Sequence, residues 1–108
     1  MCKFQCLYFG HEGYVVHYKN CRDYKLTYLS TMLTLTECDF QLLCKQVKHK
    51  CAEADYALAE HGKTVVIKTP AQGVCIFLTR FEAIKLAEIL EEADNESKAQ
   101  TLMSLFNP

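Results

Sequence analysis

The sequence has no strong charge of either sign, no long apolar run and no low-complexity linker. Its formal net charge is -1, so no overall field attracts it to nucleic acid or to an acidic membrane, and we expect neither as a partner. No apolar stretch approaches the roughly 20 residues of a membrane-spanning helix. The first residues, Met1–Cys6, lack the apolar core of an export signal. We therefore expect a cytoplasmic protein with a single domain over residues 1–108.

Sequence motifs of the common enzyme classes are missing as well. There is no glycine-rich phosphate loop, no HExxH or GxSxG motif, and no pair of carboxylates at a useful spacing. We therefore favour a non-catalytic protein and assign no catalytic residue. A CxxC pair, the usual spacing of a zinc knuckle, is also absent.

Cysteine, in contrast, is abundant, because the chain has seven. The number is odd, and several of the cysteines fall within periodic apolar segments. A secreted protein that is held together by disulfides more often has an even number of cysteines in its loops. We therefore expect reduced thiols in the cytoplasm, most of them acting as small buried hydrophobic side chains.

The spacing of apolar residues predicts a run of strands and then a mixture of strands and helices. Strands are expected at residues 3–9, 14–18, 24–28, 32–35, 64–69 and 74–78. Helices are expected from residue 37 to about 54, at 80–94 and at 97–106, with a break at Asp94–Ser97. This order predicts an α+β fold, in which an antiparallel sheet of about five strands, a meander plus a hairpin, carries two to three helices on one face. The last strand is apolar on both faces, so we expect it at the centre of the sheet.

One strand-to-helix unit occurs twice in the sequence. Thr36 and Thr79 each follow an apolar strand and suit the N-cap of a helix, because a threonine hydroxyl accepts a hydrogen bond from a free backbone N–H. Asp39 and Glu82 stand three residues later, where a carboxylate favours the start of a helix. The two units predict two capped helices and an internal pseudo-repeat.

The N-terminal third holds the residues that best fit a metal site, namely Cys2, Cys6, His11, His17 and Cys21. Structural zinc takes four thiolate or imidazole ligands in a tetrahedron, and Cys2 and Cys6 have a loose ligand spacing. The alternative is that Cys6 belongs to the core, Cys2 to the chain terminus, and the other three to the surface. We favour this alternative, so no cofactor is expected, and zinc is the one metal that the sequence leaves open.

Cys38 is the residue best placed to be a reactive thiol. It lies just after the predicted cap Thr36, where free N–H groups and the helix dipole favour a thiolate. Glu37 and Asp39 flank it and oppose a thiolate electrostatically. An ordinary, partly buried thiol is the favoured interpretation, and a thiol-based enzyme or redox sensor at Cys38 is the alternative.

A row of tyrosines follows two neighbouring strands of the predicted meander: Tyr14, Tyr18, Tyr24 and Tyr28. Tyrosine is amphipathic and common at interfaces, so this row is the surface on which we first expect a bound peptide or base. The interpretation that we favour is nevertheless that the row forms a core face or a half-covered sheet face.

Two small charged patches stand on the predicted helices. Lys45, Lys48, His49 and Lys50 are basic, and Glu91, Glu92, Asp94 and Glu96 are acidic. Two solvated helix faces explain these patches, and pairing between two subunits is the other reading. With near-neutral charge, apolar helices and no catalytic set, we expect a protein-interaction or self-associating module, with a protein partner or a homodimer.

Three segments carry a resemblance to a known family: Thr31–Phe40, Val65–Thr79 and Leu90–Ser97. With them the chain resembles, over nearly its whole length, a family of small uncharacterised bacterial proteins of the Bacteroides type. The resemblance implies a bacterial, cytoplasmic, single-domain protein and no particular activity. It also implies a CxxC pair in the first hairpin of many relatives, whereas Tyr18-Lys-Asn-Cys21 keeps only the second cysteine.

Overall fold

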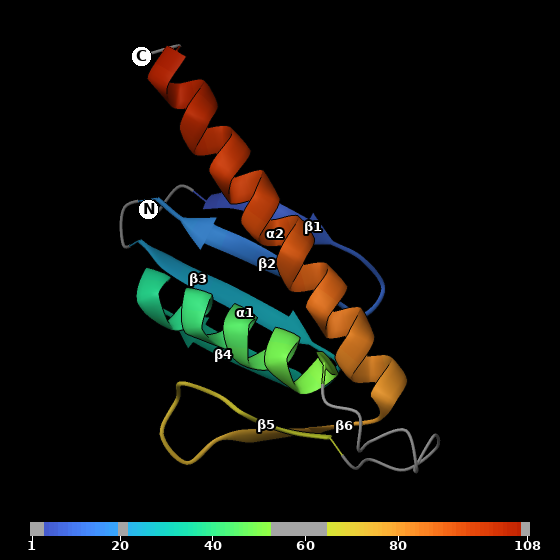
Figure 1. Ribbon diagram of the computed structural model, residues 1–108. Coiled ribbons are helices and arrows are strands. Elements are labelled where there is room, and N and C mark those ends of the chain that lie inside the picture. Colours follow the sequence, from blue (N-terminus) through green and yellow to red (C-terminus); the bar gives the residue numbers. More distant parts are fainter. Residues whose placement is uncertain (1–3, 20–21, 53–64, 107–108) are drawn as a thin grey trace.

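A computed structural model describes residues 4–19, 22–52 and 65–106 of the chain. Its elements are β1 (Phe4–Phe9), β2 (Gly13–Tyr18), β3 (Asp23–Tyr28), β4 (Thr31–Leu35), α1 (Glu37–Ala52), β5 (Val65–Lys68), β6 (Cys75–Leu78) and α2 (Arg80–Phe106). The first four strands form an antiparallel sheet in the order β1-β2-β3-β4, and β5 and β6 pair as a separate two-stranded sheet. Both helices lie on the same face of the four-stranded sheet (Figure 1). The predicted α+β fold is therefore confirmed.

Apolar residues of the middle strands form a continuous layer beneath the helices. The register places Val15 of β2 opposite Leu26 of β3, and Leu26 opposite Leu33 of β4. All three side chains are buried. Because successive residues of a strand point to opposite sides, their neighbours point away from the helices. The sheet thus has one covered face and one face on which no helix of the described residues packs.

Helix α1 begins at the predicted cap. The Thr36 hydroxyl accepts a hydrogen bond from the Asp39 N–H at 3.2 Å, and the Thr36 carbonyl accepts one from the Phe40 N–H at 2.8 Å. The stripe of Phe40, Leu43 and Val47 is then fully buried against the sheet. The cap fixes where the helix begins, and the stripe fixes which side it packs.

Helix α2 begins with a reciprocal cap. The Thr79 N–H donates to a carboxylate oxygen of Glu82 at 2.8 Å, and the Glu82 N–H donates to the Thr79 hydroxyl at 3.1 Å. The prediction of two capped helices is confirmed. The repetition is confined to the junctions, however, because β4 and β6, the strands before the two caps, belong to different sheets.

The predicted break at Asp94–Ser97 and the separate helix at 97–106 are wrong. Helix α2 runs without interruption over Arg80–Phe106. The Thr101 hydroxyl donates to the Ser97 carbonyl at 3.0 Å, one turn earlier, so the helix continues past the expected break. At this point in the sequence the apolar residues move from one side of the helix to the other. The resulting break in the apolar spacing resembles the end of a helix.

The β5–β6 hairpin was predicted, but the expected central position of its second strand is wrong. Among the described strands, β6 pairs only with β5, and it leaves Phe77 exposed. The other face of the hairpin is buried in the core, through Val65, Ile67, Ile76 and Leu78. The second apolar face of β6 is therefore an exposed surface, and the strand is not buried on both sides. Neither helix of the described residues is long and apolar enough to cross a membrane.

Candidate functional site

The apolar and polar sides of α2 exchange places near Ser97. Up to this point the side that faces the sheet is apolar and buried, with Ala83, Leu86, Leu90 and Ala93. The same side then continues at helical spacing with polar residues, Ser97, Gln100, Thr101 and Ser104. The opposite side carries exposed Phe81 and Ile84 in the first turns, then acidic residues, and then Ala99, Leu102, Met103 and Phe106. The inward side of the helix is therefore apolar in its first half and polar in its second half, and the outward side ends in an apolar stripe.

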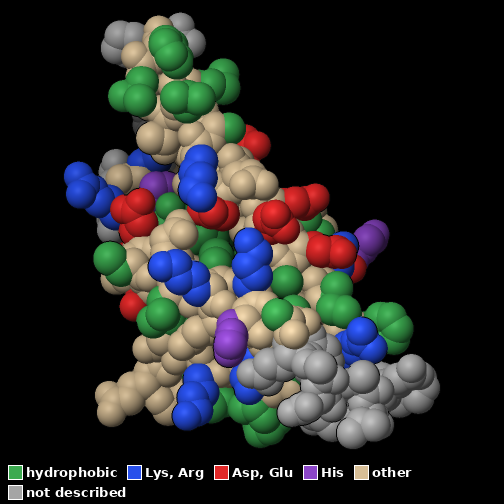
Figure 2. Space-filling view, in the orientation of Figure 1, with side chains coloured by type: hydrophobic (Ala, Val, Ile, Leu, Met, Phe, Trp, Pro, Cys, Tyr) green, Lys and Arg blue, Asp and Glu red, His purple; other side chains and the backbone are tan. Residues whose placement is uncertain are grey.

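The outward side of the last two turns is an exposed apolar surface. We call it the helix end and define it by Leu102, Met103, Leu105 and Phe106, all of which are exposed. These turns extend beyond the four-stranded sheet, and apolar side chains gather there (Figures 1 and 2). Because this stripe points away from the sheet, the described part of the fold cannot cover it.

The uncovered face of the four-stranded sheet is the second apolar surface. We call it the open sheet face, and it carries Phe4, Cys6, Phe9, Tyr14, Val16, Tyr18, Lys25 and Met32. Phe4, Phe9 and Met32 are exposed. The Phe4 and Tyr18 rings lie 6.0 Å apart, and Lys25 Nζ lies 5.5 Å from the centre of the Tyr18 ring. The Lys25 ammonium thus makes a cation–π contact with the partly exposed Tyr18 ring on this face.

The four tyrosines do not form one row, so that expectation is wrong. The register pairs Tyr14 with Thr27 and His17 with Tyr24, which places Tyr14 and Tyr18 on the open sheet face. Tyr24 and Tyr28 point to the covered face and are only 3% and 2% exposed. Half of the predicted row is therefore core, and the other half remains a predicted binding surface.

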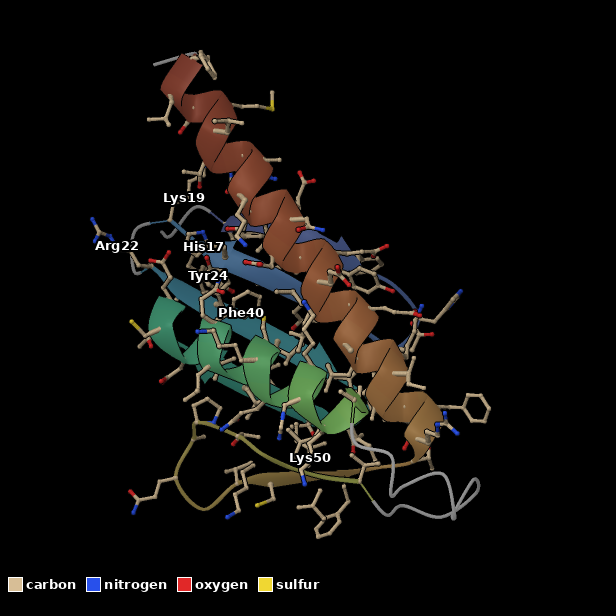
Figure 3. All side chains as sticks on the ribbon, viewed as in Figure 1. His17, Lys19, Arg22, Tyr24, Phe40 and Lys50 are labelled. Carbon is tan, nitrogen blue, oxygen red and sulfur yellow. The ribbon has the colours of Figure 1, made fainter. Side chains whose placement is uncertain are left out.

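Three stacked rings lie between the sheet and the helices. The His17 and Tyr24 rings lie 4.3 Å apart and 17° from parallel, and the Tyr24 and Phe40 rings lie 4.4 Å apart and 4° from parallel. A hydrogen bond of 3.3 Å joins the Tyr24 hydroxyl to the Ser97 hydroxyl. Figure 3 shows His17, Tyr24 and Phe40 in line, leading from the end of the sheet toward α1. The stack fixes His17 in position through its contact with a buried tyrosine.

The polar side of α2 and the end of the sheet enclose a cleft of about 400 Å³. We call it the polar cleft. Its sheet side is formed by Gln5 and His17, and its helix side by Ser97, Gln100, Thr101 and Ser104. Lys19 and Arg22 border it from the β2–β3 connection, and Glu37 borders it from the start of α1. The cleft exists because α2 turns polar residues toward the sheet in its second half, where the first half packs apolar ones.

The charges of the polar cleft are unevenly balanced. Two cations, Lys19 and Arg22, face a single carboxylate, Glu37, and neither cation has an ion-pair partner among the described residues. Arg22 has a φ of 58°, and its N–H donates to the Tyr18 carbonyl at 2.8 Å, which closes the turn below its side chain. Burial lowers the pKa of His17, Glu37 raises it, and Lys19 lowers it again, so the net pKa is below the ordinary value and the ring is neutral at pH 7.

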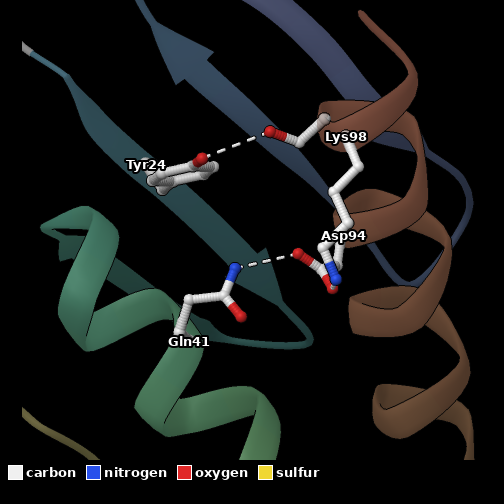
Figure 4. Close-up of polar contacts among 5 residues, drawn as sticks. Tyr24, Gln41, Asp94 and Lys98 are labelled. Atoms are coloured by element: carbon white, nitrogen blue, oxygen red, sulfur yellow. Dashed lines mark hydrogen bonds and ion pairs between the residues drawn. The ribbon is translucent and has the colours of Figure 1, made fainter. Parts of the chain in front are cut away.

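A polar contact also joins α1 and α2, near the point where the polar side of α2 begins. Gln41 donates to the Asp94 carboxylate at 2.8 Å, and Lys98 forms an ion pair with the same carboxylate at 2.8 Å (Figure 4). Burial acts to raise the pKa of Asp94, but the hydrogen bonds from Lys98 and Gln41 outweigh it, so the pKa lies below its ordinary value. Burial and the nearby Asp94 charge raise the pKa of the Cys44 thiol to about 12. This contact holds α1 against α2 and leaves Cys44 protonated at neutral pH.

The predicted metal ligands are only partly within the described residues. Cys2 and Cys21 lie outside them. Cys6 pairs with Val16 and is exposed on the open sheet face, so its expected place in the core is wrong. His17 lies on the covered face, so these two side chains do not converge. His11 lies between β1 and β2. No group of three or more metal-ligating side chains is found within the described ranges, and a zinc site remains a prediction.

Cys38 lies in the first turn of α1 and is exposed. Its place in the first turn agrees with the prediction, but the expected partial burial is wrong, and Glu37 and Asp39 flank it in the same turn. A reactive role for Cys38 also remains a prediction. Of the basic patch, Lys45 and Lys48 are exposed on α1, and of the acidic patch, Glu91, Glu92 and Glu96 are exposed on α2.

Sequence reasoning missed the polar cleft. Its helix side was visible in the sequence as polar residues that continue the i, i+3, i+4 spacing of the apolar stripe, from Ser97 to Ser104. Its cations, Lys19 and Arg22, gave no signal, because two basic residues in a loop are common and only the fold brings them beside α2.

The family model described as a family of unknown function, DUF6686, matches residues 1–106 of this chain. The resemblance to an uncharacterised family is thus confirmed. No curated protein and no solved structure matches the chain.

Proposed function

Because the chain belongs to the DUF6686 family, whose function is unknown, we propose a function from its surfaces: a non-catalytic module that self-associates. In this proposal the helix end of one copy packs on the open sheet face of a second copy. The observation that carries the proposal is the exchange of sides in α2, which turns Leu102, Met103 and Phe106 away from their own core. Exposed apolar patches of this kind mark interaction sites.

A second copy suits both surfaces because one chain carries both of them. Two helical turns present less than the roughly 800 Å² per partner of a stable interface. A twofold pair in which each helix end packs on the other copy's sheet uses two such contacts at once. The exposed rings of Phe4 and Phe9 and the side chain of Met32 supply the apolar surface that receives it.

The charges near the helix end favour the sheet over a second helix. Glu91, Glu92 and Glu96 are exposed on α2 just before the helix end. Two such helices that packed on each other would bring like charges together, which costs free energy. The open sheet face instead offers Lys25, which lies over the Tyr18 ring. Acidic α2 against basic Lys25 is thus the complementary arrangement.

Sedimentation equilibrium over a wide concentration range tests this proposal. We expect a reversible dimer whose Kd rises about tenfold or more in Phe106→Glu, because a charge enters the apolar contact. Phe81→Glu is the matched control: Phe81 is 73% exposed at the start of the same helix, compared with 77% for Phe106, and it lies outside the proposed contact.

The receiving surface is tested by Met32→Glu, which places the charge on the open sheet face. We expect the same loss of dimer as in Phe106→Glu, with an unchanged circular dichroism spectrum in both variants. A monomer at every concentration would overturn the proposal, and so would an equal effect of Phe81→Glu and Phe106→Glu.

A further inference from the structure

Strand β6 has a free edge on the side that faces away from β5. The Thr69 N–H donates to the Val74 carbonyl at 3.2 Å, which marks a hydrogen-bonded position of the β5–β6 hairpin. Such positions alternate along an antiparallel pair, so every second residue from Val74 onward directs its N–H and C=O groups toward β5. Cys75 and Phe77 lie between these residues and direct their backbone groups toward the free edge. Among the described residues, no backbone group pairs with them there.

The side chains along this edge are apolar. Phe77 is 59% exposed and Cys75 is exposed, and both lie on the outer face of the hairpin, where Val66 of β5 stands opposite Phe77. Proteins usually protect an edge strand with a charge, a proline or a bulge. Strand β6 (Cys75-Ile-Phe-Leu78) contains no charge and no proline, and its pairing with β5 is regular. The edge is therefore open to the addition of another strand.

The edges of the other described strands are less suited to such an addition. The pairing of β1 is irregular between Cys6 and Tyr8, as at a bulge. The β5–β6 hairpin of the same chain lies beyond β4, on the side away from β3 (Figure 1). Strand β5 borders a hollow that it shares with α1, and it carries the exposed Lys68. Strand β6 alone among them combines a regular, uncharged edge with exposed apolar side chains.

We propose that β6 pairs with β6 of a second copy of the chain, in antiparallel orientation about a twofold axis at Ile76. This register places Cys75 of each copy opposite Phe77 of the other, and it pairs both N–H and both C=O groups that each strand offers. A twofold axis brings identical residues together, so the contact requires an edge without charge. The nearest charged side chain on the outer face is Lys68, which lies on β5, one strand away from the axis. The two hairpins thereby form one four-stranded sheet.

The contact is small, so the association is weak and depends on concentration. Two strands of four residues bury far less than the roughly 800 Å² per partner of a stable interface. None of the residues involved belongs to the helix end or to the open sheet face, so this pairing does not depend on the self-association proposed above. With both contacts, the chain has two different surfaces for its own copies and can form assemblies larger than a dimer.

Amide hydrogen exchange followed by NMR tests the pairing in the full-length Phe106→Glu variant, in which the proposed contact of the helix end is weakened. In dilute solution the N–H groups of Cys75 and Phe77 should exchange quickly, and those of Ile76 and Leu78 slowly, because only the second pair is bonded to β5. At the highest attainable concentration, exchange at Cys75 and Phe77 should slow by about fivefold or more. Exchange rates of these two amides that do not change with concentration would overturn the proposal, whether or not Phe106 contributes to a dimer.

A proline at the edge tests the role of the backbone. Cys75→Pro removes an N–H that points away from β5, so the hairpin keeps its own bonds and Ile76 should still exchange slowly. The variant should abolish the protection of Phe77 and weaken association about tenfold or more in sedimentation equilibrium. Cys75→Ala is the matched control, because it keeps the N–H and removes only the thiol, and it should leave both measurements unchanged. Equal effects of the two variants would contradict the pairing.

A charge at the edge tests the same contact through a side chain. Phe77→Lys places two like charges near the twofold axis and should weaken association by a similar factor, also if Cys75→Pro opens the hairpin. Phe81→Lys is the control, because Phe81 is 73% exposed and lies outside β6, and it should leave association unchanged. Equal losses in the two lysine variants would overturn the assignment to β6.

Discussion

Tyr28 and Glu82 are joined by a hydrogen bond of 2.6 Å, which runs from the phenol of β3 to the backbone carbonyl of the first turn of α2. The two residues are 54 positions apart in the sequence. Tyr28 is almost completely buried, so its hydroxyl depends on this partner. The bond therefore sets where α2 begins its path across the sheet.

Tyr28→Phe should lower the free energy of unfolding by about 0.5–1.5 kcal/mol, because the helix carbonyl keeps its intrahelical partner and only the tyrosine contact is lost. Urea denaturation followed by circular dichroism measures this change, since the chain has no tryptophan. An unchanged midpoint at neutral pH would contradict the structural role of the bond.

The same tyrosine should make the fold sensitive to alkali. Burial, assisted by the charges of Glu82, Glu12 and Tyr8, raises the pKa of Tyr28 in the folded state. The unfolded chain therefore loses this proton first, so the stability that Tyr28 contributes is present below about pH 10 and is lost as the pH rises above it. Urea midpoints between pH 8 and pH 11 should fall less steeply in Tyr28→Phe than in the unmodified chain; parallel curves would speak against this assignment.

The two threonine caps should differ in their contribution to stability. Thr79→Ala removes an acceptor from the reciprocal bond with Glu82 and should cost about 1 kcal/mol. Thr36→Ala removes one exposed bond to the Asp39 N–H and should cost less. Comparison of the two variants by urea denaturation measures the difference directly. A larger cost for Thr36→Ala would show that the reciprocal cap of Thr79 and Glu82 is not the stronger of the two caps.

The stability that the contact between α1 and α2 contributes should depend on pH. The pKa of Asp94 lies below its ordinary value, because hydrogen bonds from Lys98 and Gln41 outweigh the effect of burial. This stability is present above about pH 4 and is lost as the pH falls. Asp94→Asn should therefore lower the urea midpoint at pH 7 and have a smaller effect at pH 3. Glu92→Gln, on the exposed side of α2, is the control and should have little effect at either pH.

The cysteines should divide into two classes when native protein is alkylated with iodoacetamide and its peptides are analysed by mass spectrometry. Cys38 is exposed, whereas Cys44 is half-buried and has a pKa raised to about 12, so Cys38 should react much faster. In urea the two rates should converge. If Cys38 labels no faster than a model thiol, the alternative of a thiol enzyme or redox sensor is lost.

Local chemistry made much of the fold predictable. Thr36 and Thr79 cap their helices as expected, because a cap depends on a residue and its neighbours within one turn. The strands were predicted for a similar reason, since alternation is a property of the segment itself. The division into two sheets was not predicted, because it depends on how segments pair across the whole chain.

The faces of the strands were harder to predict than the strands themselves. Tyr14 and Tyr24 occupy matching places in two alternating segments, so the sequence alone predicts that their side chains lie on the same face of the sheet. The β2–β3 connection instead pairs His17 with Tyr24, and a shift of one residue sends a whole strand's side chains to the other face. The assignment of Tyr14 and Tyr24 to different faces therefore follows from the length of a turn, which periodicity does not encode.

The exchange of sides in α2 separates two kinds of evolutionary constraint along a single helix. Up to Ala93 each inward substitution alters the core and with it the fraction of folded protein. Among the described residues, none beyond Ala93 is buried, so a change in the last turns leaves the core intact. Such turns are free to drift, and to acquire a different partner, at little cost to folding. In a mutational scan of α2 that measures protein abundance, substitutions in the first half should therefore lower abundance strongly, and substitutions in the second half should have little effect.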